Sequence, residues 1–303
     1  AWPRMRQLLL PPKMMMIFRV LLVVWCWWGL SVEGSAWGVT RVVAWNIEWF
    51  PGQQMNEVTP EMEERHMTVV QSVLREMNPC VLLSSEIRDW RSFDLAVSVV
   101  PGLKVCAVSA FRDREFGELW RQQVAIAARL PVVAAWSESF RPTLTSMVRG
   151  FAFAALEAPQ QPGKVWLFYS VHLKSNRAFN QNQAEINYRL RNESIRQILS
   201  HVEEMERLVF RDRVAAVIVA GDFNTNHDGQ FGDEVVKMMT AAGFRNTWEG
   251  VPRGERLTWR GSEQFEPTTF DYVFTRGLPR LRARMLEVPA EASDHHAVLL
   301  EIP

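Results

Sequence analysis

The segment VIVAGDFNTNHDG, Val217 to Gly229, joins an apolar run directly to a cluster of polar residues. Residues 217–220 have the composition of a buried strand, and the Gly, Asp and Asn residues that follow are common in turns. One interpretation is that the residues Gly-Asp-Phe-Asn only form a turn at the end of the strand. The alternative is that the carboxylate of Asp222 and the amide of Asn224 take part in chemistry, and the rest of the chain decides between these two interpretations.

The chain has 303 residues, of which 48% are hydrophobic and 22% charged, and this composition is typical of a globular protein. Its length fits one large domain or two small ones. Lys and Arg together number 34, as do Asp and Glu, so the chain carries no global basic surface that would indicate nucleic-acid binding. A metal-dependent nuclease with a local basic rim remains compatible with this balance.

The N-terminal segment has the pattern of a secretory signal. Basic residues precede the first acidic residue, Glu33, and the apolar stretch VLLVVWCWWGL occupies 20–30. Small residues follow at 34–36 and predict cleavage after Ala36. The apolar stretch is shorter than the roughly 20 residues of a membrane span. We therefore expect residues 1–36 to be a signal peptide of an exported protein, periplasmic or extracellular, with an uncleaved membrane anchor as the alternative.

Hydrophobic periodicity predicts a mixed order of helices and strands. The predicted helices are 61–77, 92–100, 182–210 and a segment around 232–242. The predicted strands are 39–45, 80–86, 103–110, 122–129, 149–157, 164–173, 214–220, 256–260, 270–275, 283–288 and 297–302. Long runs of strands with helices inserted at intervals predict two packed sheets with helices outside. No linker-like composition interrupts residues 39–303, so we expect one domain there.

Three cysteines are few for a disulfide-rich protein. Cys80 and Cys106 lie on consecutive predicted strands and could pair in an oxidising compartment. The alternative is that both are unpaired thiols, which behave as small buried hydrophobic residues. Neither has the neighbours of a zinc site.

Polar side chains recur at the ends of the predicted apolar strands. Asn46 and Glu48 are two residues apart, so alternation along a strand places them on one face, and Asp222 and Asn224 repeat this spacing. The remaining members of the set are Glu86, His172, Asp271, Asp294 and His295. Each alone is compatible with a solvated strand end. Because strand ends of a two-sheet sandwich can converge on one cleft, the whole set predicts a single site.

This set of side chains suits the hydrolysis of a phosphoester with the help of a hard cation. Mg²⁺ prefers carboxylate oxygens and keeps several waters. It offsets charge on the phosphoryl oxygens and on the leaving group. An Asp–Asn pair can hold and deprotonate a water, an imidazole can act as acid or base, and a second carboxylate can fix its tautomer.

These motifs resemble those of the DNase I-like endonuclease/exonuclease/phosphatase superfamily, in the same order across nearly all of residues 40–303. They are Asn46-Ile47-Glu48, Glu86, His172-Leu173, Gly221-Asp222-Phe223-Asn224, Asp271-Tyr272 and Ser293-Asp294-His295. The resemblance implies an α+β fold, a four-layer α/β/β/α sandwich of two mixed sheets flanked by helices. The local sequences EWFPG, HLKSN and TFDYVF are most similar to bacterial members of unassigned substrate.

The resemblance also implies a metal site. Glu86 would be the main Mg²⁺ ligand, with Mn²⁺ as a possible substitute. Asn46, Glu48 and Asp294 would complete or flank this site. One departure is Ser85, which stands where relatives commonly have Gln.

The same resemblance implies catalytic roles. Asp222 and Asn224 would orient and activate the nucleophilic water. His295 would contact the scissile phosphate and be oriented by Asp271. His172 would contact the phosphate or protonate the leaving group.

Three further residues are expected to contact the substrate. Arg149 matches an Arg that can bind a phosphate oxygen, for which a guanidinium is suited, although a solvated strand-edge Arg is the alternative. Lys174 and Asn176 follow His172 and would be local substrate contacts, with a plain polar loop as the alternative. His296 should face away from the site because it follows His295 directly.

The leading functional hypothesis is a secreted, Mg²⁺-dependent phosphodiesterase that acts on nucleic acid. The alternatives are an enzyme of the same fold for phospholipids or inositol phosphates, and a binding module that has lost catalysis. We expect no stable protein partner, and membrane contact only if the N-terminal segment stays uncleaved.

Overall fold

The computed structural model describes residues 38–113, 117–141, 149–227 and 234–303. The predicted signal segment 1–36 and the start of the helix expected around 232–242 lie outside the described residues. Residues Val39–Pro303 form one compact unit. Among the described residues, no helix has the length and apolar character that a membrane crossing requires.

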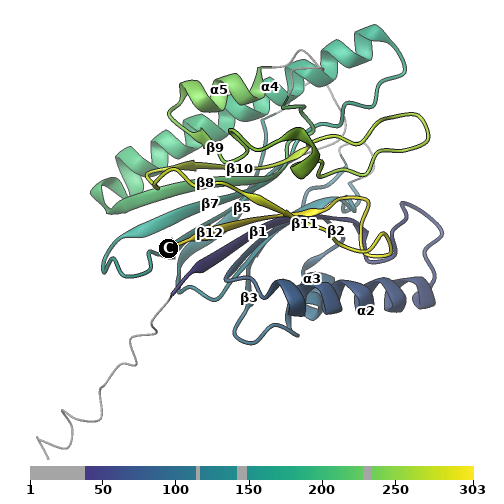
Figure 1. Cartoon of the computed structure of the whole chain (residues 1–303), viewed down its shortest axis with the longest axis horizontal. Coiled ribbons are helices and arrows are strands. Elements are labelled where there is room, and N and C mark those ends of the chain that lie inside the picture. The colour runs from purple at the N-terminus through teal and green to yellow at the C-terminus, as the bar shows by residue number, and fades with distance from the viewer. Residues whose placement is uncertain (1–37, 114–116, 142–148, 228–233) are drawn as a thin grey trace, which may run out of the picture. The chain divides into compact units, whose positions relative to one another are not determined.

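Two mixed six-stranded sheets form the centre of this unit (Figure 1). The first has the order β11-β12-β1-β2-β4-β3, with bounds Arg284–Leu286, Ala297–Ile302, Thr40–Phe50, Val81–Ile87, Gln123–Ala128 and Lys104–Val108. The second has the order β5-β6-β7-β8-β10-β9, with bounds Val132–Ser139, Gly150–Glu157, Val165–His172, Val214–Asp222, Asp271–Arg276 and Arg245–Asn246.

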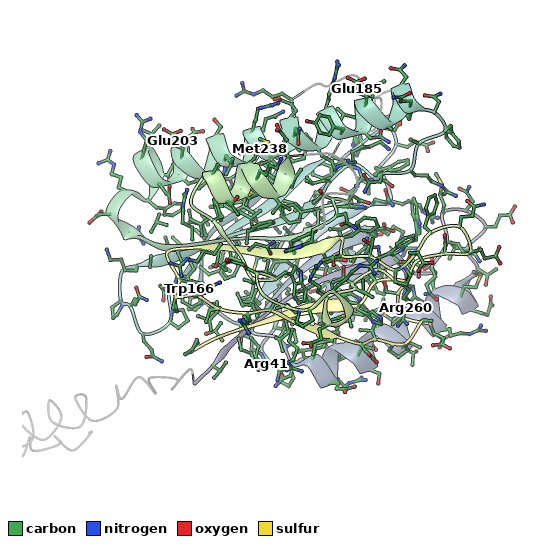
Figure 2. The ribbon with its side chains drawn as sticks, turned by 45° about the horizontal axis from the view of Figure 1, so that its top comes forward. Arg41, Trp166, Glu185, Glu203, Met238 and Arg260 are labelled. Atoms are coloured by element: carbon green, nitrogen blue, oxygen red, sulfur yellow. The ribbon has the colours of Figure 1, made fainter. Side chains whose placement is uncertain are left out.

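Helices cover the outer faces of both sheets. Helices α2 (Pro60–Met77) and α3 (Trp90–Val97) lie against the first sheet, and α4 (Gln181–Glu204) and α5 (Val235–Ala241) against the second (Figure 1). Short helical turns are η1 (Met205–Val209), η2 (Arg211–Arg213) and η3 (Arg253–Glu255). Figure 2 shows Glu185 and Glu203 on the outer side of α4, away from the sheets. The predicted four-layer α/β/β/α sandwich is therefore confirmed.

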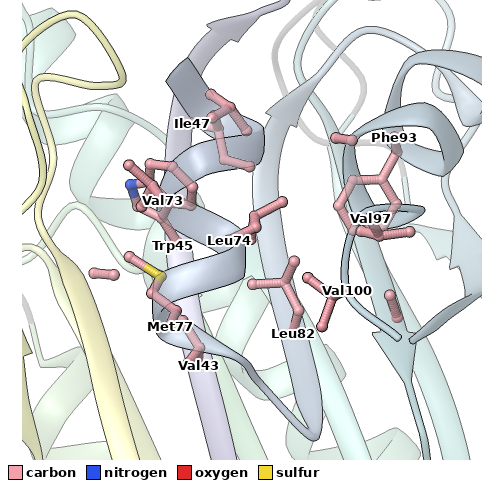
Figure 3. Close-up of a cluster of buried hydrophobic side chains, with 14 of the residues drawn as sticks. Val43, Trp45, Ile47, Val73, Leu74, Met77, Leu82, Phe93, Val97 and Val100 are labelled. Carbon is pink, nitrogen blue, oxygen red and sulfur yellow. The ribbon is translucent and has the colours of Figure 1, made fainter. Parts of the chain in front are cut away.

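Helix α2 begins and ends where its sequence provides caps. The side chain of Thr59 accepts a hydrogen bond from the backbone N–H of Met62, Pro60 occupies the first turn, and Asn78 adopts a left-handed conformation at the end. One stripe of the helix packs on β1 and β2 (Figure 3). The buried side chains labelled there are Val43, Trp45, Ile47, Val73, Leu74, Met77, Leu82, Phe93, Val97 and Val100. This packing fixes α2 against the strand that carries Asn46.

Parallel pairing brings several predicted site residues to the same ends of the sheets. In the first sheet β1 runs parallel to β2, with Asn46 opposite Ser85. In the second, β7 runs parallel to β8 and His172 lies opposite Asp222. Strand β10 pairs antiparallel with β8 and places Asp271 opposite the same Asp222. In each sheet the polar residues therefore lie together at the ends of neighbouring strands.

Some sequence-based expectations differ from the structure. Strand β5 (Val132–Ser139) was not predicted, because it is the edge strand of its sheet and its mixed burial gives no clear apolar pattern. The strand expected at 256–260 is wrong: Trp259 makes isolated bridges to Thr268 and His295 there. The long predicted helix ends at Glu204 and continues as a π-helical turn.

The thiols of Cys80 and Cys106 are both free, so the disulfide alternative is not seen. Cys80 is buried and matches the expected small hydrophobic residue, whereas Cys106 is partly exposed. Burial raises the pKa of the Cys106 thiol to about 11. The Cys106 thiol is therefore not an activated nucleophile at neutral pH.

Candidate active site

The side chain of Asn46 connects the two sheets. Its Nδ2 atom donates to Oε1 of Glu86 at 3.2 Å and to Oδ2 of Asp222 at 3.1 Å. Its Oδ1 atom accepts from the backbone N–H of Glu48 at 3.0 Å, which fixes the orientation of the amide. Because Asn46 is 1% exposed, this link is shielded from water. The predicted metal residues of one sheet and the predicted catalytic residues of the other therefore lie in one site.

Glu86 lies at a bend in β2 and adopts a φ of 62°. Glu48, Trp49 and Asn224 at neighbouring strand ends also have positive φ, which costs non-glycine residues about 1–3 kcal/mol each. The Oε2 atom of Glu86 accepts from the backbone N–H of Trp49 at 2.9 Å. Burial raises the pKa of Glu86 despite this hydrogen bond. The strained backbone thus directs a buried carboxylate toward the interface between the sheets.

Glu48 and Asp294 come from opposite ends of the chain and meet directly. The backbone N–H of Asp294 donates to Oε2 of Glu48 at 3.0 Å, and Gln53 donates to the same oxygen at 2.9 Å. Burial, followed by repulsion from the Asp294 carboxylate, raises the pKa of Glu48 to about 7. The indole N–H of Trp259 donates to Oδ2 of Asp294 at 3.0 Å.

The GDFN segment acts both as a turn and as part of the site. Gly221 has a φ of 136°, and a Cβ atom there would lie 2.1 Å from the carbonyl oxygen of Val171 on β7. Only glycine tolerates this approach. The carboxylate of Asp222 accepts from the backbone N–H of Asn224 at 2.8 Å, and the Asn224 amide donates to the carbonyl of Leu173 at 3.1 Å. Burial, followed by the nearby charge of Asp271, raises the pKa of Asp222 to about 7.

His295 and Asp271 form a buried ion pair. The Nδ1 atom of His295 lies 2.7 Å from Oδ2 of Asp271, which is fully buried. Burial alone would lower the pKa of His295, but the charge and hydrogen bond of Asp271 hold it well above its ordinary value. The Nε2 atom of His295 lies 3.9 Å from Oδ2 of Asp222. The predicted orienting role of Asp271 is therefore compatible with the geometry.

His172 lies between the two sheets on the other side of Asp222. Its Nε2 atom is 3.5 Å from Oδ2 of Asp222 and 3.8 Å from Oε1 of Glu86. Burial, followed by the positive charge of Arg149, holds its pKa well below the ordinary value. His172 is therefore a neutral imidazole at neutral pH, in contrast to His295.

Arg149 supports the end of β7. Its guanidinium donates to the backbone carbonyls of His172 at 2.9 Å and Leu173 at 3.0 Å, and to Gln122 at 3.0 Å. The alternative of a solvated strand-edge Arg is therefore wrong. The proposed phosphate contact stays a prediction.

The loop after β7 brings Lys174 and Asn176 to the edge of the site. Burial, followed by the charges of Arg149 and Arg191, lowers the pKa of Lys174 to about 8. Asn176 donates to the backbone carbonyl of Asn224 and so ties this loop to the GDFN segment. Substrate contact by either residue stays a prediction.

Other residues support the site, and of these Arg260 carried no signal that identified it in the sequence. Ser293 donates to the carbonyl of Asn46 at 2.7 Å and accepts from the backbone N–H of His295 at 2.9 Å. Arg260, labelled in Figure 2, donates to the carbonyl of Ser293 at 3.3 Å. His296 accepts from the backbone N–H of Val288 at 3.2 Å and thus faces away from the site, as predicted.

The donor atoms at the junction fit a hard divalent cation. Burial together with neighbouring acids raises the pKa of both Glu48 and Glu86, and a bound cation would offset this cost. Asp222, Asp271 and His295 also offer ligand atoms within 4.8 Å of one another. Because Asp271 and His295 are already hydrogen-bonded as a pair, we assign these three to proton chemistry. The carboxylates of Glu48, Glu86 and Asp294 are the oxygen ligands that Mg²⁺ prefers. Asn46 was predicted to join them, but its amide presents an N–H donor to Glu86, and its Oδ1 atom accepts from the backbone N–H of Glu48.

The sequence matches the Endonuclease/Exonuclease/phosphatase family over residues 43–295. No curated protein matches the sequence.

Solved structures share the fold at low sequence identity. TDP2 from C. elegans is 16% identical with a TM-score of 0.61, over 88% of this chain and 75% of that one. A mannosyl-6-phosphatase from Bacteroides thetaiotaomicron is 15% identical with a TM-score of 0.60, over 87% and 99%. A family protein from Leptotrichia buccalis is 13% identical with a TM-score of 0.60, over 87% and 99%. The family match covers most of the chain, and the chain therefore belongs to the Endonuclease/Exonuclease/phosphatase family.

Proposed function

We propose that the protein is a Mg²⁺-dependent phosphodiesterase with nucleic acid as its substrate. The observation that carries this proposal is the bridge by Asn46 between Glu86 and Asp222, which joins an oxygen-rich cation site to an acid–base group. The family supports phosphoester hydrolysis in general, and the choice of a diester in nucleic acid is the finer part of the proposal.

Asp222 is the group proposed to accept a proton from the attacking water. Its pKa of about 7 places it close to neutral pH, where a carboxylate base combines adequate basicity with a large ionised fraction. The backbone N–H of Asn224 holds one of its oxygens at 2.8 Å, so the other oxygen faces the junction between the sheets.

His295 is proposed to stabilise charge on the phosphoryl oxygens. Because Asp271 keeps the imidazole protonated, its Nε2–H is available as a positively charged donor. A donor already held in place needs no reorganisation during the reaction, which makes its electrostatic contribution large. When bound beside Glu86, a divalent cation would supply further charge neutralisation on the phosphoryl oxygens and the leaving group.

His172 is proposed to contact the phosphate as a neutral imidazole. It lies within 4 Å of both Asp222 and Glu86 but has a lowered pKa, so it contributes a hydrogen bond without a full positive charge. Lys174, Arg149 and the exposed Arg177 form the positive side of the same edge and would favour a polyanion.

The proposed site of action is outside the cytoplasm. The basic N-terminus, the apolar stretch 20–30 and the small residues at 34–36 support export. N-terminal sequencing of the protein from its own host should give a chain that begins near Trp37. An intact N-terminus in the membrane fraction would support the anchor alternative instead.

A hydrolysis panel tests the substrate assignment. Plasmid DNA, RNA, sphingomyelin, inositol phosphates, mannose 6-phosphate and bis-p-nitrophenyl phosphate are each incubated with Mg²⁺. We expect cleavage of nucleic acid with little sequence preference, and inhibition by NaCl as counterion release weakens binding. Cleavage of sphingomyelin while DNA and RNA survive would instead assign a lipid substrate and contradict the nuclease proposal.

A further inference from the structure

The buried side chain of His66 connects two loops of the candidate site. His66 lies on α2 and is 3% exposed. Its Nδ1 atom is 2.9 Å from the backbone N–H of Gly52, and its Nε2 atom is 2.8 Å from the backbone carbonyl of Ala292. An N–H can only donate and a carbonyl can only accept, so these partners assign the neutral tautomer with a proton on Nε2. Burial lowers the pKa of His66, in agreement with a neutral ring.

Each of these loops adjoins or carries a proposed cation ligand: Glu48 lies near the end of β1, just before the first loop, and Asp294 lies in the second loop. Gly52 follows Glu48 by four residues, and Ala292 precedes Asp294 by two. The loops are also joined by Gln53, which donates to Oε2 of Glu48 at 2.9 Å and to the carbonyl of Ala290 at 2.8 Å. Gln53 is itself part of the first loop. His66 instead reaches both loops from α2, a helix that is held in place because its apolar stripe packs on the first sheet.

We propose that His66 is a positioning residue for the cation site: its ring ties the β1–α2 loop to the β11–β12 loop, so that Glu48 and Asp294 face one cation. This inference rests on the metal site of the proposed function. Hydrogen-bonding partners outside the ligand set of a metal commonly change metal affinity by about 10- to 100-fold when they are lost.

Packing alone is the competing explanation. The ring of His66 contacts that of Phe50 edge-to-face, with centroids 5.2 Å apart. Replacement of His66 would therefore lower stability in either case, and stability cannot separate the two explanations. Cation affinity separates them, because packing alone does not require the β1–α2 and β11–β12 loops to be held together.

Tb³⁺ titration of the full chain provides this measurement. Tb³⁺ is an oxygen-seeking probe whose luminescence is excited through nearby tryptophans. The indole N–H of Trp259 donates to Asp294, and Trp49 donates its backbone N–H to Glu86. Competition with Mg²⁺ gives the affinity for Mg²⁺ itself. Glu86→Gln locates the signal, because it should weaken Tb³⁺ binding if the probe occupies the proposed site.

Three variants of His66 remove the two hydrogen bonds separately and together. His66→Asn keeps an acceptor near the position of Nδ1, His66→Gln keeps a donor near that of Nε2, and His66→Leu keeps neither. We expect Tb³⁺ affinity to fall by about 10- to 100-fold in His66→Leu and by less in the other two. His201→Leu is the matched control, because His201 is a buried histidine on α4 bound to Tyr169 at 2.9 Å. It should lower stability without changing Tb³⁺ affinity.

Wild-type Tb³⁺ affinity in the folded His66 variants would overturn the proposal. If none of the variants folds, hydrogen exchange of the wild-type protein decides: Mg²⁺ should slow exchange of the Gly52 amide, since coupling between the cation and the loop is reciprocal. Unchanged exchange at Gly52 would contradict the proposal. If the wild type binds Tb³⁺ through Glu86 but hydrolyses no phosphoester, the proposed function fails while the role of His66 is still decided by the variants. If the wild type binds no cation at this site, both the proposed function and the proposed role of His66 are contradicted.

Discussion

The Nδ1 atom of His295 lies 2.7 Å from Oδ2 of Asp271, in a pair with almost no access to water. A buried imidazole would normally lose its proton, yet the Asp271 carboxylate reverses this and holds the pKa of His295 well above its ordinary value. His172, about as buried, has no such carboxylate partner at hydrogen-bonding distance and is neutral. Two histidines in one site therefore carry different charges, which allows them to take different roles.

The first prediction concerns the charged histidine. His295→Ala should lower kcat by about 10²–10³-fold, the usual cost of losing one preorganised electrostatic donor. His296→Ala is the control and should cost little, because His296 binds the backbone of Val288 outside the site. Steady-state hydrolysis of bis-p-nitrophenyl phosphate measures kcat of both variants. A larger loss of kcat in His296→Ala than in His295→Ala would contradict the assignment.

The second prediction concerns the dependence of activity on pH. Asp222 must be ionised to accept a proton, so kcat/KM should rise as pH increases through the pKa of this carboxyl, about 7 before a cation lowers it. His295 must keep its proton, so activity should fall as pH rises through its raised pKa.

Asp271→Asn identifies the group behind the alkaline limb of this profile. It removes the charge that raises the pKa of His295, so the alkaline limb should move to lower pH. The control is the acidic limb, which should not move to higher pH because removal of Asp271 also removes a charge that raises the pKa of Asp222. An alkaline limb that stays in place in Asp271→Asn would exclude His295 as its source.

The third prediction concerns the glycine of GDFN. In Gly221→Ala the new Cβ atom would lie 2.1 Å from the carbonyl oxygen of Val171, at a φ of 136°. We expect a loss of roughly 2–4 kcal/mol in the free energy of unfolding, from backbone strain and overpacking together. Gly163→Ala is a matched control because Gly163 has a φ of 80° and no atom within 4 Å of its Cβ position, so it should lose about 1–2 kcal/mol. Equal losses in urea denaturation would contradict the steric argument.

Much of the fold follows from local sequence patterns. The apolar stripe of α2 and the apolar runs of β2 and β8 are strong signals, and the structure has these elements within two residues of the expected bounds. Strand β5 gave no such signal because an edge strand is stabilised by pairing with β6 and not by burial of its own side chains. Segment 256–260 has strand-forming residues, yet its backbone makes isolated bridges to two different partners.

The residues of the candidate site that lie at the ends of apolar strands could be predicted from the sequence. Asn46, Asp222 and Asp271 belong to recurring motifs, and strand pairing brings them together. The contacts of His66 and Gln53 could not be predicted, because both depend on the path of a loop more than 200 residues away in sequence. The unequal protonation of His172 and His295 also depends on such long-range neighbours.

Metal dependence is the central claim, and hydrolysis of bis-p-nitrophenyl phosphate across a range of Mg²⁺ concentrations tests it most directly. Wild-type activity should vanish in EDTA and return with Mg²⁺ or Mn²⁺. Glu86→Gln should need more Mg²⁺ for half-maximal activity, because a neutral amide is a poorer ligand for a hard cation. Full wild-type activity in EDTA, or an unchanged Mg²⁺ requirement in Glu86→Gln, would contradict the proposed mechanism.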